Sequence, residues 1–157
     1  MLLTDPGIDR LIDQVNSRRL PHYIAKKHIP SKAMNTDGSA FFSVDSTTLP
    51  WEQRINPHLP APIFRKVLHT DAETGVFFQL VRYPCGVINP SHTHPCAHAM
   101  YVLEGTLITH RGSHGPGSFV WFPEGEVMEH GAGPQGDVTA LLVSNKPFAI
   151  HYVDSSP

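Results

Sequence analysis

Three histidines lie close together in the middle of the chain, in the segment Gly86 to His98. His92 and His94 are two residues apart, so on a β-strand both imidazole rings point to the same face. His98 keeps this parity after the short break 95–97. Neutral imidazole nitrogens that converge on one point bind zinc, iron, nickel, copper or manganese. The spacing therefore predicts a metal site, in preference to a histidine-rich surface loop.

The other histidines do not have this spacing. His110 and His114 lie at or in a glycine-rich turn over residues 111–117 and are expected to be solvated. His22, His28, His58, His69 and His151 are scattered along the chain. Two cysteines flank the pair of histidines, and in a chain without a leader they are expected to be free thiols. Cys96 lies between His94 and His98, so its sulfur could approach a metal, although a small loop residue is the simpler interpretation.

Many short segments follow one another along the chain, since 15 prolines and 12 glycines interrupt its 157 residues. Such punctuation favours an all-β antiparallel barrel over a helical fold. Strands are expected at residues 63–69, 76–83, 99–103, 106–110, 118–122, 126–130, 138–144 and 148–153. The segments 99–103 and 106–110 are expected to pair around Glu104 and Gly105. About eight or nine strands would thus form a small closed or sandwich-like barrel.

The first third of the chain is less regular. Ile8, Leu11, Ile12 and Val15 repeat at helical spacing, which predicts a short helix with one apolar stripe. The range 39–44 could form a further strand, and the proline-rich range 47–62 is expected to be a loop packed on the barrel.

Two spaced motifs connect these segments to a known family. The first contains Gly86, His92, His94, His98 and Gly105, and the second contains Gly117, Pro123, Gly125 and His130. Together they resemble the two motifs of the cupin superfamily. The family normally has a glutamate at the position of His98. Its second-motif histidine would stand at Met128, whereas His130 follows two residues later, on the same face of a regular strand.

The resemblance implies a small cupin barrel, that is, a double-stranded β-helix or jelly roll, with a short N-terminal helix. We expect one cupin domain over residues 1–157, with an N-terminal helix and irregular or edge-strand extension at 1–62 and the metal-binding barrel at 63–153. The expected metal ligands are His92, His94, His98 and His130. Met100 and Met128 share the faces of His98 and His130, so both are expected to line an apolar substrate pocket.

Four neutral ligands would leave the metal with its full charge. Such a centre favours an anionic chelating ligand, for example an enolate. Within the cupins the chain is similar to the acetylacetone dioxygenase and 2,4′-dihydroxyacetophenone dioxygenase families. This similarity implies an Fe(II) enzyme that cleaves a carbon–carbon bond beside a carbonyl of a small enolisable ketone or aryl ketone, with dioxygen as co-substrate. Zinc, manganese or nickel are the alternative metals.

Two other functions stay open at this point. One is a non-catalytic metal-binding sensor, like the zinc-binding cupin domains of anti-sigma factors, and the other is a zinc- or manganese-dependent isomerase or lyase. The formal net charge is −2, and no basic stripe suggests a nucleic acid or membrane partner. The N-terminus has no signal-peptide pattern, so a cytoplasmic protein is expected. The resemblance also implies a homodimer.

Overall fold

The computed structural model describes residues 41–153 of the chain. Contacts between Cα atoms divide the chain into residues 1–34 and 35–157, and all described residues belong to the second unit. The predicted helix at residues 8–15 lies outside them, so it stays a prediction, as does the single-domain organisation. Residues 41–44, the described end of the strand considered at 39–44, have no regular structure. Within 41–153 no helix has the length and apolarity needed to cross a membrane.

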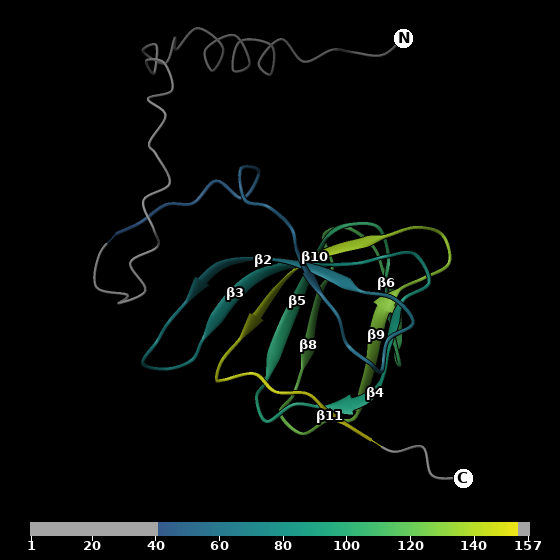
Figure 1. Ribbon diagram of the computed structural model, residues 1–157. Coiled ribbons are helices and arrows are strands. Elements are labelled where there is room, and N and C mark those ends of the chain that lie inside the picture. The colour runs from purple at the N-terminus through teal and green to yellow at the C-terminus, as the bar shows by residue number, and fades with distance from the viewer. Residues whose placement is uncertain (1–40, 154–157) are drawn as a thin grey trace, which may run out of the picture. The chain divides into compact units, whose positions relative to one another are not determined.

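The described residues form an all-β fold of eleven strands in two antiparallel sheets, which face each other in Figure 1. The six-stranded sheet has, in spatial order, β1 (Glu52–Arg54), β2 (Ile63–Thr70), β3 (Phe77–Tyr83), β10 (Val138–Ser144), β5 (His98–Glu104) and β8 (Phe119–Phe122). The five-stranded sheet has β11 (His151–Tyr152), β4 (Ile88–Thr93), β9 (Met128–Ala132), β6 (Leu107–Thr109) and β7 (Gly112–His114).

The core lies between the sheets because alternate residues of each strand point inward. Its fully buried side chains include Met100, Val102, Leu107, Phe122 and Met128. The two methionines thus point inward, as the parity of their strands predicted. His92, His94, His98 and His130 are buried as well, and the ring centroid of each lies within 4.9 Å of at least one other ring centroid of the four.

The expected hairpin between residues 99–103 and 106–110 is wrong. β5 pairs with β10 and β8, whereas β6 lies in the other sheet and pairs with β9 and β7. Gly105 makes this change of sheet, since its φ of 75° is accessible mainly to glycine. A Cβ atom there would lie 2.0 Å from the carbonyl oxygen of Asp137. The turn therefore carries the chain across the barrel rather than back along β5.

Two strands lie in segments that were expected to be loop or turn. β1 falls in the proline-rich segment 47–62 and pairs with β2, and β7 falls in the glycine-rich segment 111–117 and pairs with β6. Each has only three residues, which is too short for an alternating pattern to stand out in the sequence.

Candidate metal centre

Three buried histidines come together at the neighbouring strands β4 and β9 of the five-stranded sheet. His92 lies in β4, His94 directly follows it, and His130 lies in β9, the neighbour of β4. One ring nitrogen from each lies within 4.8 Å of the others, and all three residues are at most 2% exposed. Such a group of nitrogens can hold one metal ion.

Hydrogen bonds to the main chain fix the tautomer of two of these rings. Nδ1 of His92 donates to the carbonyl oxygen of Pro90 at 2.6 Å, and Nδ1 of His94 donates to that of Ala149 at 2.6 Å. A carbonyl oxygen only accepts, so the proton of each neutral ring is on Nδ1. The lone pair of each ring is therefore on Nε2, which is the arrangement that metal-ligating histidines have.

The remaining nitrogens are buried without a hydrogen-bond partner within the described residues. They are Nε2 of His94 and both ring nitrogens of His98 and of His130. Buried polar atoms are nearly always paired, because an unpaired one loses its hydration without compensation. A metal ion bound by His94 and His130 would supply the missing partner, so these residues fit a metal.

All four rings are held in the neutral form that binds metals. Burial lowers the pKa of His94 to about 4 and that of His98 to about 3. It also lowers the pKa of His92, and it lowers that of His130 well below its ordinary value. The cause is the same in each case, since the interior disfavours the charged imidazolium. No proton has to leave these rings when a metal binds at neutral pH.

His98 lies beside the group of three without being part of it. Its ring centroid is 4.7 Å from that of His94 and 6.1 Å from that of His130. The ring stacks on Phe122 at 4.7 Å with an interplanar angle of 14°. The predicted inward direction of His98 is thus confirmed, and its role as a fourth ligand stays a prediction.

A series of hydrogen bonds connects His92 to Asn89, Tyr152 and Asn56. Nδ2 of Asn89 lies 3.3 Å from Nε2 of His92, and the hydroxyl of Tyr152 donates to Oδ1 of Asn89 at 2.7 Å. The Tyr152 hydroxyl in turn accepts a hydrogen bond from Nδ2 of Asn56. The ring of His58 stacks on Tyr152 at 3.7 Å. No motif of the sequence indicated these residues.

Strand parity places Asn89 on the wrong face, because it is three residues from His92. The pairing of β4 with β9 shifts register between Asn89 and His92, so both side chains point inward. Pro90 lies inside this irregularity. Since a proline within a strand is typical of bulges and edges, Pro90 was the one indication that the alternation would break there.

A pocket opens beside the histidines. Apolar side chains such as Phe148 line part of it, and its polar lining residues are Asn56, Gln79, Tyr83, Asn89, His94 and His130. Met100 and Met128 are packed in the core and do not line this pocket. A role of these two methionines in substrate binding stays a prediction.

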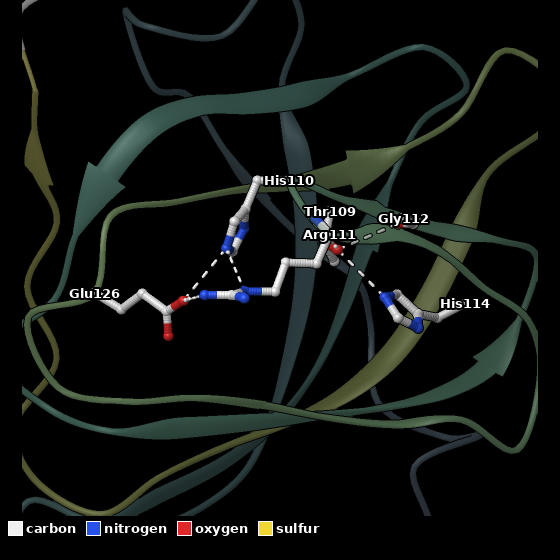
Figure 2. Close-up of polar contacts among 6 residues, drawn as sticks. All are labelled: Thr109, His110, Arg111, Gly112, His114 and Glu126. Atoms are coloured by element: carbon white, nitrogen blue, oxygen red, sulfur yellow. Dashed lines mark hydrogen bonds and ion pairs between the residues drawn. The ribbon is translucent and has the colours of Figure 1, made fainter.

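The histidines of the β6–β7 hairpin lie outside the site. Arg111 pairs with Glu126 at 2.6 Å and donates through Nε to Nε2 of His110 at 3.1 Å. His114 contacts the hydroxyl of Thr109 at 3.2 Å. Dashed lines mark these contacts in Figure 2. These contacts connect surface segments, and neither histidine belongs to the group of three that could hold a metal among the described residues.

Both cysteines are free thiols, as expected, with Cys85 exposed and Cys96 buried. Burial raises the pKa of the Cys96 thiol, so it stays protonated at neutral pH. A protonated thiol is a poor metal ligand, which favours the simpler interpretation of this residue.

Solved structures with the same architecture include several cupins. The polyketide cyclase RemF from Streptomyces resistomycificus is 23% identical, with a TM-score of 0.63 over 74% of this chain and 88% of that chain. A candidate acetylacetone dioxygenase from Methylibium petroleiphilum is 15% identical, with a TM-score of 0.64 over 75% and 85%. A cupin-like protein from Thermotoga maritima is 20% identical, with a TM-score of 0.58 over 66% and 84%.

Identities of this size establish the fold alone. Among curated proteins, none is similar enough to count as a match. A family model, the ChrR cupin-like domain, matches residues 39–149, which is most of the chain and includes all four buried histidines. The cupin resemblance of the two motifs is therefore confirmed, and the protein belongs to the ChrR cupin-like domain family.

Proposed function

We propose that the protein is a metal-dependent dioxygenase, with Fe(II) as its metal, that cleaves a carbon–carbon bond beside a carbonyl in a small enolisable ketone. The observation that carries this proposal is the group of three buried histidines, each of which brings one ring nitrogen within 4.8 Å of the others. With three neutral ligands, an iron ion there would keep positions for a chelating substrate and dioxygen and would polarise the carbonyl group.

The chemistry needs no further reductant. Dioxygen places one oxygen atom on each carbon of the cleaved bond, giving a carboxylate and a second carbonyl, and the substrate supplies all the electrons. The residues of the pocket would bind and orient the ketone. Phe148 and the other apolar side chains would exclude water, and the neutral histidines would add no negative charge that repels an enolate.

The test combines metal analysis with oxygen uptake. The purified protein is expected to hold about one iron per chain and to consume dioxygen when a β-diketone or an α-hydroxy aryl ketone is added. His130→Ala should lose both properties. His110→Ala is the matched control, because His110 is a surface residue and the Arg111–Glu126 pair persists without it. Iron-loaded protein that consumes no dioxygen with either substrate class would contradict the proposal.

A second candidate function is a metal-binding sensor. It is favoured by one observation, the ring of His98 with two unpartnered nitrogens beside the group of three. Four histidines could close a tetrahedral zinc site, and closed sites are typical of structural rather than catalytic zinc. One tightly held zinc per chain with no turnover would support this function. Zinc or manganese with turnover that needs no dioxygen would instead indicate an isomerase or lyase.

A further inference from the structure

The donors in the series of hydrogen bonds beside the metal centre all point the same way along the series. The backbone N–H of His58 donates to Oδ1 of Asn56 at 3.0 Å, and Nδ2 of Asn56 donates to the hydroxyl of Tyr152. That hydroxyl donates to Oδ1 of Asn89 at 2.7 Å, which leaves the Nδ2 group of Asn89 facing His92 at 3.3 Å. Every donor therefore points toward the metal centre, and the series ends there in an amide N–H.

The tautomer of His92 confirms this direction independently. Its Nδ1 carries the proton because that atom faces the carbonyl oxygen of Pro90. Its Nε2 is then an acceptor, so the group of Asn89 that faces it must be the NH₂ and not the oxygen. The orientation of the Asn89 amide is thus fixed from both of its ends.

A metal ion would change the partner of this amide. His92 has one lone pair on Nε2, and a metal bound there would occupy it. Asn89 is 3% exposed, so its N–H group would then be a buried donor that has lost its acceptor. A buried donor of this kind favours any ligand that brings an acceptor to it. Asn89 lines the pocket together with His94 and His130, so such a ligand lies within its reach.

We infer that Asn89 is a ligand-binding residue of the pocket, which donates a hydrogen bond to an oxygen atom of a small anionic chelating ligand. Tyr152 and Asn56 are positioning residues, since they hold the amide with its NH₂ toward the ligand. This inference rests on the metal centre proposed above and names the group that selects an oxygen anion there. The segment that follows β1 supplies Asn56, so it becomes part of the site.

The experiment uses the Co(II)-loaded protein and acetohydroxamate, an anionic chelator with two oxygen donors, and follows binding by visible absorption. Asn89→Leu removes the donor and should weaken acetohydroxamate binding about tenfold. Asn89→Asp keeps the shape but replaces the donor by a negative charge, so it should weaken binding more than Asn89→Leu. Tyr152→Phe should weaken it by a smaller factor, about threefold. Tyr101→Phe makes the same change on an exposed tyrosine and should have no effect.

The order of the two Asn89 variants separates ligand binding from a structural role. A structural residue would tolerate the isosteric aspartate better than leucine, so stronger acetohydroxamate binding by Asn89→Asp than by Asn89→Leu overturns the inference. Unchanged affinity in both variants with full Co(II) occupancy also overturns it. If either variant fails to fold, Tyr152→Phe with wild-type affinity is sufficient to refute it. Wild-type protein that binds no Co(II) refutes the metal centre itself, and this inference with it.

Discussion

His98 is the residue at which the chain departs from the usual cupin ligand set, since the family has a glutamate there. Both of its ring nitrogens are buried without a partner in the described structure, next to His94. If it is a fourth ligand, His98→Ala should lower the affinity for the metal about tenfold or more without loss of the fold. Competition with a chromophoric chelator measures this affinity. Equal affinities in the variant and the wild type would leave a three-histidine site.

Replacement of His98 by glutamate tests the charge of the centre. His98→Glu should retain the metal, because carboxylate oxygen also binds divalent ions. The added negative charge should weaken an anionic chelator such as acetohydroxamate relative to the wild type. Visible absorption of the Co(II)-loaded variant measures that affinity. Tighter binding of the anion by His98→Glu would contradict the argument that a carboxylate-free centre favours anionic ligands.

The buried histidines also predict how the metal-free protein responds to acid. Burial lowers the pKa of His98 to about 3 in the folded state, against about 6.5 when unfolded. The folded state thus binds fewer protons at His98 between these values, so the contribution of its neutral ring to stability is fully present above pH 6.5 and is lost as the pH decreases toward 3. In His98→Phe the new ring can still stack on Phe122. When the pH is lowered from 7 to 4.5, the free energy of unfolding of this variant should decrease by about 2 kcal/mol less than that of the wild type.

Urea unfolding at both pH values, with a chelator present, measures this difference. Equal losses in the two proteins would show that His98 titrates normally when the protein is folded.

At the level of single residues, strand parity predicted the inward direction of His92, His98, His130 and both methionines. It did so because side chains alternate strictly along a regular strand. It missed Asn89, since the irregularity at Pro90 shifts the alternation by one residue. The spacing of residues in the sequence also could not indicate Tyr152 as part of the site, because the pairing of β11 with β4 brings it to Asn89.

Among the elements, β9 approaches the start of β4 closely at Gly131. A Cβ atom on Gly131 would lie 2.2 Å from the carbonyl oxygen of Val87 and 2.6 Å from Cα of Ile88. Gly131→Ala should therefore separate the strands, destabilise the protein by about 1–3 kcal/mol and weaken metal binding through the adjacent His130. Chemical unfolding and metal titration measure both effects.

Gly133→Ala is the matched control for this substitution. Its added methyl would meet only the flexible side chain of Ile108, at 3.1 Å. This variant should therefore lose clearly less free energy of unfolding than Gly131→Ala. Similar losses in the two variants would mean that the space between β4 and β9 does not determine the position of His130.

The long strands β2, β3 and β10 were predictable because each is rich in apolar, β-branched or aromatic residues and has turn residues at its ends. Their partners were less predictable. β10 pairs with β3 and β5, which lie far from it in sequence, and the short turn at Gly105 resembled a hairpin although it changes sheets. Local patterns report on elements, whereas pairing between distant strands depends on how the whole barrel buries its core.

For the whole molecule we predict a homodimer formed through the edge of the six-stranded sheet at β8. β8 has one neighbour among the described strands, so one side of its backbone is unpaired. Phe119 and Trp121 on this edge are 65% and 53% exposed, and Tyr101 and Leu103 on β5 extend the apolar surface. A second copy could continue the sheet and cover both aromatic rings.

Light scattering should give about twice the chain mass of 17.4 kDa, and Trp121→Glu should give the mass of one chain. His69→Glu, on a distant strand, is a control that should remain dimeric. A wild-type mass of 17.4 kDa at all concentrations would refute the prediction.

The hydrogen bonds that orient His92 and His94 end on carbonyl oxygens of the main chain, at Pro90 and Ala149. Every amino acid has a carbonyl oxygen, so the acceptor at position 149 survives any substitution that keeps the path of the backbone. Ala149 is also exposed, which leaves room for larger side chains. The orientation of these two rings can therefore be kept while the surrounding sequence changes. Distant relatives can then share the metal centre with few other residues in common.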